Sequence, residues 1–108
     1  MTTRHAACVL AAGAALLASP APAADLAAGR AKANACAVCH GPLGMAAAPD
    51  APNLAGQPAI YLSAQLKAFR SGTRVHEVMG VIAKPLSDAD IGDLVAWYSS
   101  LKVQVLPP

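Results

Sequence analysis

Cys36-Ala37-Val38-Cys39-His40 places two cysteines three positions apart, with a histidine directly after the second. This spacing is the attachment motif of a c-type haem, because each thiol can form a thioether with a haem vinyl group and the adjacent imidazole can then bind the iron. A redox dithiol is expected in a βαβ context, and a closed zinc site needs four ligands. The sequence has neither a βαβ pattern nor a second C-x-x-C pair. We therefore expect one covalent haem c, bound through Cys36 and Cys39, with His40 as the proximal iron ligand.

The start of the chain has the features of a secretory signal. Arg4 gives a positive beginning, residues 6–17 form an apolar run of twelve, and Ala21-Pro22-Ala23 offers the small residues that a signal peptidase recognises. The run is shorter than the roughly 18 apolar residues of a membrane span, so a retained membrane anchor is the weaker alternative. We expect residues 1–23 to be a signal peptide, cleaved after Ala23, and the protein to be periplasmic without stable membrane insertion.

The segment that follows, residues 24–108, is expected to form one domain. Its seven basic and six acidic residues give a net charge of +1, and the only cysteines beyond Cys8 are those of the haem motif. No basic stripe is available to neutralise phosphates, so nucleic acid is excluded as a partner. The segment holds four aromatic residues, few for a core of this size. A haem would supply the missing apolar bulk.

A first helix is predicted just before the motif. Asp25 can cap a helix that runs from about Leu26 toward Cys36, through a stretch dominated by alanine, the residue with the highest helix propensity. Gly29 lowers the stability of such a helix. It therefore indicates a close approach by another backbone or by a bulky side chain.

Two further helices are predicted from their ends and their apolar spacing. Pro58 suits the first turn of a helix that reaches about Arg70. Ser87 is an N-cap candidate for a last helix, in which Asp88 and Asp90 favour the positive end of the helix dipole. The apolar residues of this last helix recur at helical spacing: Ile91, Leu94, Val95, Tyr98 and Leu101.

Two irregular segments separate these helices. Residues 41–57 contain three prolines and three glycines and show no helical period, which is typical of a loop. A seventeen-residue loop is unusual in so small a domain unless it packs on a ligand, so we expect it to wrap over the haem. Residues 73–86 form the second irregular segment, and Met79 is expected to lie there in a loop.

Three side chains beyond residue 23 are candidates for the distal position of the iron: Met79, Met45 and His76. Met45 follows His40 by only five residues, too few to cross easily to the opposite haem face, and an apolar loop contact is its alternative role. His76 would give a two-histidine iron, but its charged neighbours indicate a solvated turn. Met79 lies 39 residues beyond His40 with ample chain between them, and we favour it.

Five stretches match one known family in order and at plausible spacing: residues 36–41, 52–57, 61–74, Met79 and 86–91. With them the chain resembles a small monohaem class I cytochrome c of the cytochrome c4/c553 type. The resemblance implies an all-α, class I cytochrome c fold, with three to four short helices and long loops wrapped around one covalently bound haem. Dihaem members carry two such domains, whereas this chain has a single C-x-x-C-H motif, which excludes an internal two-haem relay.

The resemblance also implies roles for individual residues. Cys36 and Cys39 would carry the thioethers, with His40 as the proximal and Met79 as the distal iron ligand. The carbonyl of Pro52 would accept a hydrogen bond from the free ring nitrogen of His40 and so fix its tautomer.

Other positions follow from the resemblance less directly. The first and last helices of the family cross at a glycine packed against an aromatic residue, which here is Gly29 with Trp97 or Tyr98. The residues that the resemblance places beside the haem are Leu54, Tyr61, Arg70 and Arg74. For the tyrosine and the two arginines, solvated positions are an equal alternative.

A histidine nitrogen and a thioether sulfur leave no open position on the iron for a substrate, and the soft sulfur favours the ferrous state. We therefore expect a monomeric, soluble electron carrier and not an enzyme. Its partners would be a donor dehydrogenase or membrane complex and an acceptor oxidase or reductase, in short-lived contacts. Two alternatives remain: a five-coordinate haem protein that binds gas or reduces peroxide, and a haem subunit of a larger dehydrogenase complex.

Overall fold

The computed structural model describes residues 18–108, in which all regular elements are helices and no strand occurs. In chain order its elements are α1 (Leu26–Lys32), the 3-10 helix η1 (Ala33–Ala35), α2 (Ala37–His40), α3 (Ala59–Ser71), α4 (Glu77–Ala83) and α5 (Asp88–Ser100). The all-α prediction is confirmed, although five α-helices replace the three to four expected. Within the described range no helix is long and apolar enough to cross a membrane. Residues 1–17 of the predicted signal peptide lie outside it, and its cleavage stays a prediction.

The first predicted helix begins where expected. Asp25 caps α1 by accepting the backbone N–H groups of Ala27 and Ala28 at 2.8 and 3.2 Å. The α-helix ends earlier than predicted, at Lys32, because the chain tightens into η1 before it reaches Cys36. This change of direction allows α2, which carries the motif, to leave the line of α1.

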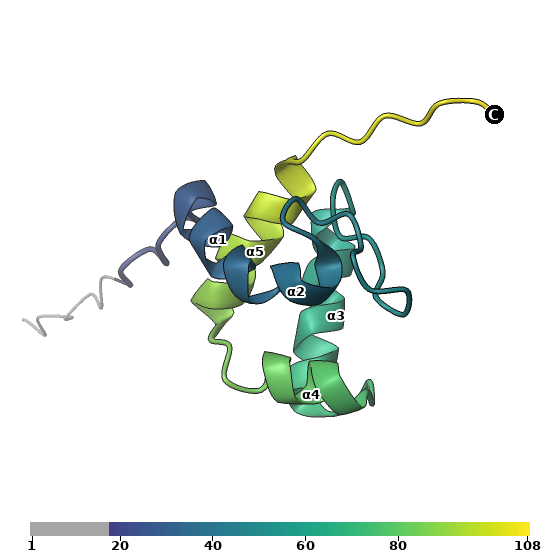
Figure 1. The fold of residues 1–108 in the computed structure, drawn as a ribbon. Helices are drawn as coiled ribbons and strands as arrows, with labels where there is room; N and C mark the ends of the chain where they lie inside the picture. Colours follow the sequence, from purple (N-terminus) through teal and green to yellow (C-terminus); the bar gives the residue numbers. More distant parts are fainter. Residues whose placement is uncertain (1–17) are drawn as a thin grey trace, which may run out of the picture.

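Helix α1 lies across α5 in Figure 1, and Gly29 is buried at their contact. A Cβ atom at Gly29 would lie 2.0 Å from the carbonyl oxygen of Asp93 and 2.9 Å from Cβ of Trp97. The close approach predicted from Gly29 is therefore confirmed, with Trp97 as the aromatic partner. Tyr98, the other aromatic candidate, packs elsewhere, with its ring against Gly44 in the loop.

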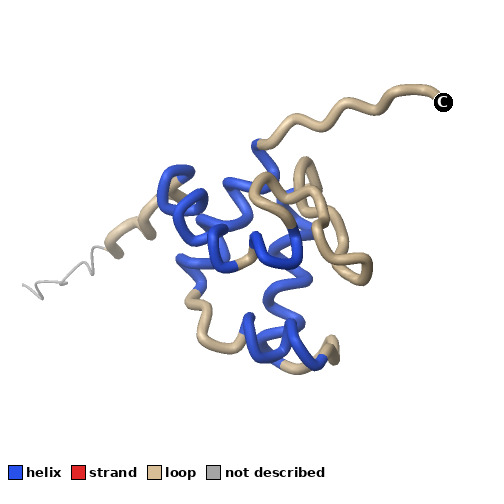
Figure 2. Tube along the Cα trace, in the orientation of Figure 1, coloured by secondary structure: helices blue, strands red, loops and turns tan. Residues whose placement is uncertain are grey.

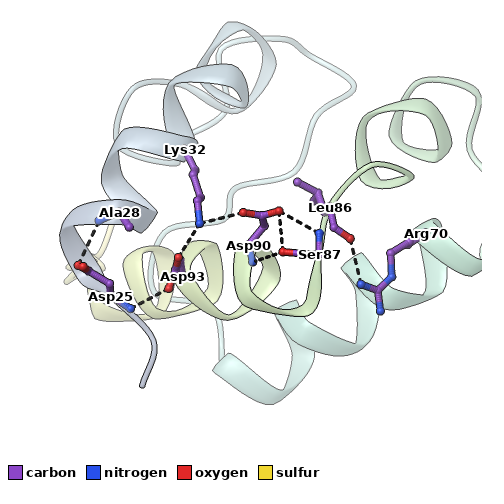
Figure 3. A network of polar contacts seen from close by, with 8 residues as sticks. All are labelled: Asp25, Ala28, Lys32, Arg70, Leu86, Ser87, Asp90 and Asp93. Atoms are coloured by element: carbon purple, nitrogen blue, oxygen red, sulfur yellow. Dashed lines mark hydrogen bonds and ion pairs between the residues drawn. The ribbon is translucent and has the colours of Figure 1, made fainter. Parts of the chain in front are cut away.

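A polar network fastens the same helix pair (Figure 3). The backbone N–H of Asp25 donates to Oδ1 of Asp93 at 2.7 Å, and Lys32 Nζ contacts Asp93 Oδ2 at 2.6 Å and Asp90 Oδ1 at 2.9 Å. Asp90 also completes a capping box with Ser87 at the start of α5. The Asp25 N–H and the Lys32 ammonium hold the pKa of Asp93 below its usual value, and the two carboxylates raise the pKa of Lys32.

The core lies mainly along one face of α5. Four of the five residues predicted from its periodicity are buried, and the fifth, Leu101, is partly buried and packs against them. Helix α3 adds Leu62, and η1 adds Ala33. Ile91 is the one large side chain with less than 2 % of its surface exposed within the described range. The protein part of this core is small, as the composition suggested.

Helix α3 begins after Pro58 and ends at Gly72, close to the predicted limits. Gly72 has a φ of +81°, a left-handed conformation that glycine adopts without strain. The segment that follows contradicts the sequence prediction, because residues 73–86 are not wholly irregular. They contain α4, which Figure 2 shows as a short helix between two loops.

The long loop between α2 and α3 is irregular, as predicted. It folds back on itself, since the carbonyl of Gly44 accepts the N–H groups of Leu54 and Ala55 at 2.7 and 3.0 Å. The N–H of Gly56 donates to the carbonyl of Tyr98 at 2.9 Å. The loop is thereby tied to the C-terminal end of α5.

Candidate functional site

His40 closes α2 with a buried side chain, 7 % exposed. Its Nδ1 lies 2.8 Å from the carbonyl oxygen of Pro52 in the long loop. A carbonyl can only accept, so a neutral ring must carry its hydrogen on Nδ1 and keep the lone pair of Nε2 free. Among residues 18–108, this is the one side-chain hydrogen bond that His40 makes. The ring is thus in the tautomer that a metal ligand bound through Nε2 requires.

Cys36 immediately precedes α2 and Cys39 lies within it, and both are partly buried free thiols. Side chains three positions apart on a helix project from the same side, so both sulfurs face one region. The Cys39 carbonyl also accepts the N–H groups of Ala47 and Ala48 at 2.9 and 3.0 Å, which joins the long loop to α2. Two thiols and a free imidazole nitrogen on one short helix fit the covalent attachment of a haem.

The described part of the chain holds no cluster of side chains that would form a metal site of another kind. Over residues 18–108, no group of three or more His, Cys, Asp or Glu side chains is placed to hold a metal ion.

The three distal candidates occupy different settings. Met79 lies in α4 and is partly buried, which corrects the prediction that it lies in a loop. Met45 is 49 % exposed in the loop directly after α2. His76 is exposed and caps α4, with Nδ1 accepting the backbone N–H of Met79 at 3.1 Å. Of the three, Met79 is the least exposed to solvent.

The two arginines considered as haem neighbours have partners within the protein. Arg70 donates from Nη1 to the carbonyl of Leu86 at 3.0 Å and from Nη2 to Oδ1 of Asp88 at 2.7 Å. This contact holds the pKa of the Asp88 carboxyl below its usual value. The Arg74 guanidinium lies over the Phe69 ring, 4.5 Å from its centre. Arg70 therefore links α3 to the start of α5, whereas Arg74 packs on α3.

The other two residues that the resemblance placed beside the haem differ in burial. Leu54 is partly buried and packs against the core cluster, whereas Tyr61 on α3 is 46 % exposed.

Tyr98 stands beside the haem motif, a position that the sequence interpretation missed. Its side chain is 4 % exposed, and its hydroxyl has no hydrogen-bond partner among residues 18–108. Cys36 packs against the core cluster that contains Tyr98. The Cys36 thiol is the polar neighbour of the Tyr98 hydroxyl. The position of Tyr98 on the apolar face of the last helix could have indicated a buried hydroxyl.

Comparisons with known proteins agree over most of the chain. Residues 26–102 match the family model described as cytochrome c. Cytochrome c-554(548) of Halomonas halodenitrificans is 47 % identical over 79 residues, which cover 70 % of this chain and 95 % of that protein. A thiosulfate dehydrogenase electron acceptor of Stutzerimonas stutzeri is 42 % identical over 69 residues, or 61 % of this chain and 32 % of that protein.

A solved structure gives the same result in three dimensions. The cytochrome c4 structure from Acidithiobacillus ferrooxidans superposes with a TM-score of 0.69 at 39 % sequence identity. The match covers 77 % of this chain and 53 % of that one. The chain thus spans nearly all of one relative and about half or less of the other two.

Proposed function

Since this chain belongs to the cytochrome c family, we propose that it is a periplasmic carrier of single electrons whose one haem c is ligated by His40 and Met79. Membership of the family confirms the class I cytochrome c fold, the covalent haem c and the general role in electron transport. The ligand pair, the compartment and the identity of the partners are the proposal.

The contact between His40 Nδ1 and the Pro52 carbonyl, 2.8 Å long, is the observation that carries the proposal furthest. It orients a buried ring, makes Nε2 the more basic nitrogen and removes the alternative tautomer. A ligand held in one orientation needs little rearrangement when the charge beside it changes. His40 therefore supplies a fixed proximal bond.

Met79 is the distal ligand in this proposal. Its side chain is partly buried, and its helix is fixed at the start by the His76 cap. When bound, the haem supplies a one-electron couple at its iron. A thioether sulfur is a soft donor that favours the reduced state, and a second protein ligand leaves no position for substrate. The chain then acts by holding the haem and excluding chemistry at the iron, so we propose that it is not an enzyme.

Redox proteins of the donor or acceptor type are the proposed partners. The net charge of the segment after residue 23 is only +1, so electrostatic steering is weak and apolar contacts matter more. Beside Met79, the side chains of Val75 and Val81 are 91 % and 71 % exposed. The relative named as an electron acceptor of thiosulfate dehydrogenase favours a second candidate, a haem subunit in permanent association with a dehydrogenase. Purification of the protein as a lone monomer would contradict this second candidate.

Visible spectra of the oxidised and reduced protein test the ligand pair. The wild type should be low-spin and show a methionine-to-iron charge-transfer band. Met79→Ala should lose the band and bind carbon monoxide, whereas Met45→Ala should keep the band, as should His76→Asn, in which the amide can still cap α4. A high-spin wild type that binds carbon monoxide would show a five-coordinate iron and overturn the proposal.

Cell fractionation and mass spectrometry test the compartment. The protein should appear in the periplasmic fraction, with Ala24 as its first residue. Retention in the membrane fraction with residues 1–23 intact would show an uncleaved anchor instead.

A further inference from the structure

We propose that the buried hydroxyl of Tyr98 donates a hydrogen bond to the sulfur of Cys36 and so positions the first of the two thioethers. The proposal assigns a role to a residue outside the C-x-x-C-H motif. It rests on the covalent haem attachment of the family and is independent of the identity of the distal ligand.

The hydroxyl of Tyr98 needs a partner. The side chain is 4 % exposed, its oxygen is out of contact with solvent, and no hydrogen bond reaches it within residues 18–108. Buried hydroxyl groups in folded proteins are almost always hydrogen-bonded, because an unpaired one loses its hydration without compensation. An unpaired hydroxyl in so small a core therefore points to a bond that forms in the mature protein.

The long loop contacts Tyr98 at two points, its ring and its backbone carbonyl. The backbone of Gly44 lies so close that a Cβ atom there would be 2.9 Å from Cδ1 and 3.0 Å from Cε1 of the ring. The N–H of Gly56 binds the carbonyl of Tyr98 itself at 2.9 Å. The long loop thus holds both the ring and its backbone, and the hydroxyl keeps its direction.

The sulfur of Cys36 is the polar group next to this hydroxyl. Cys36 packs on the same cluster as Tyr98, where burial raises the pKa of the thiol and the Tyr98 hydroxyl opposes that rise. Burial and the neighbouring sulfur together raise the pKa of Tyr98 above its ordinary value. The hydroxyl therefore keeps its proton at neutral pH and remains a donor.

Haem attachment fixes the direction of this bond. A free thiol can donate its own proton or accept one, so either partner can be the donor before attachment. A thioether sulfur carries no proton and retains its lone pairs. Once Cys36 is bonded to the haem, Tyr98 is the only possible donor of the two. The bond then withdraws electron density from a sulfur attached to the haem, which favours the reduced state.

Tyr98→Phe removes the hydroxyl and keeps the ring, so it is the variant that isolates this bond. Ser100→Ala is the matched control, because it deletes a hydroxyl two positions away on α5 that already donates to the Trp97 carbonyl at 2.7 Å. In the reduced holoprotein, proton NMR should show a slowly exchanging tyrosine hydroxyl with a nuclear Overhauser effect to the β protons of Cys36. Tyr98→Phe should lose this signal and have a lower reduction potential, and Ser100→Ala should change neither.

Resonance Raman spectra give a second measurement on the wild type alone. The carbon–sulfur band of the Cys36 thioether should shift when the protein is transferred from H2O to D2O, because the donor becomes O–D. A hydroxyl proton without a contact to Cys36, or a band that is the same in both solvents, would overturn the proposal. The Raman comparison does not depend on which residue is the distal ligand, so a wrong distal ligand would not be mistaken for a missing Tyr98 bond.

Discussion

Replacing Gly29 by alanine should destabilise the protein, although alanine is the better helix former. A methyl group at this position would lie 2.0 Å from the carbonyl oxygen of Asp93, 2.7 Å from its carbonyl carbon and 2.9 Å from Cβ of Trp97. Two of these atoms belong to the backbone of α5, so no change of rotamer can relieve the contact. Helices α1 and α5 would have to separate.

The size of the effect follows from two opposing contributions. Overpacking a tight contact costs about 1–3 kcal/mol, and the upper end applies here because backbone must move. The higher helix propensity of alanine returns about 1 kcal/mol. Separation of the helices also lengthens the contacts of Asp93 with Asp25 and Lys32. We expect a net loss of about 2 kcal/mol, which for a domain of this size lowers Tm by about 8–16 °C.

Thermal and urea unfolding of the purified holoprotein, followed by circular dichroism, measures this loss. Gly92→Ala on α5 is the matched control, because the nearest atom to its added methyl group is Cβ of Ala24 at an ordinary 3.9 Å. Without a clash, the control should gain about 0.5–1 kcal/mol from helix propensity. The two glycine-to-alanine changes should thus have opposite signs. A Gly29→Ala protein as stable as the wild type would refute the reasoning about the helix crossing.

Two further changes test the polar contacts of α5. Asp93→Asn should lower Tm at pH 7, and the gap from the wild type should narrow as the pH falls below about 4, because the Asp25 N–H and Lys32 depress the pKa of Asp93 in the folded state alone. A gap that stays constant from pH 7 to pH 3 would contradict this. Ser87→Ala removes the N-cap of α5 and should cost about 1 kcal/mol in urea unfolding. Ser99→Ala removes a hydroxyl that donates to a carbonyl of its own helix. This control variant should change stability by less than about 0.5 kcal/mol.

The helices that could be predicted are those with a local signal at the start. Asp25 and Ser87 are capping residues, and the structure places them at the starts of α1 and α5. Gly29 was interpreted from its unfavourable propensity, and the backbone contact that explains it is present. These features depend on neighbouring residues or on a single conspicuous glycine, so the sequence contains them directly.

Helix α4 could not be predicted in the same way. It has seven residues, its N-cap is the histidine side chain of His76, and it contains Gly80. Several of its apolar side chains are exposed, including Val78 and Val81. The sequence therefore lacks the separate polar and apolar faces that would indicate a helical period. Its helical conformation depends on packing against α3, which is a tertiary contact. The sequence therefore predicted a loop at Met79, the proposed distal ligand, although this residue lies in a helix.

Parts of the site depend on contacts between distant segments and were accessible only through the family resemblance or not at all. The approach of the Pro52 carbonyl to His40 follows from the path of an irregular loop, and the resemblance alone suggested it. The position of Tyr98 beside Cys36 depends on how α5 meets the motif, and neither periodicity nor resemblance indicated it.

The contact between Asp25 and Asp93 joins residues 68 positions apart, nearly the whole length of the folded domain. A chain that is delivered from its N-terminus can form this contact only after α5 has emerged, since closing the largest loop of the fold requires both ends. Until then, the motif cysteines belong to an open chain and are not yet packed against α5. We therefore expect the haem to be attached before α5 packs against α1 and closes the fold.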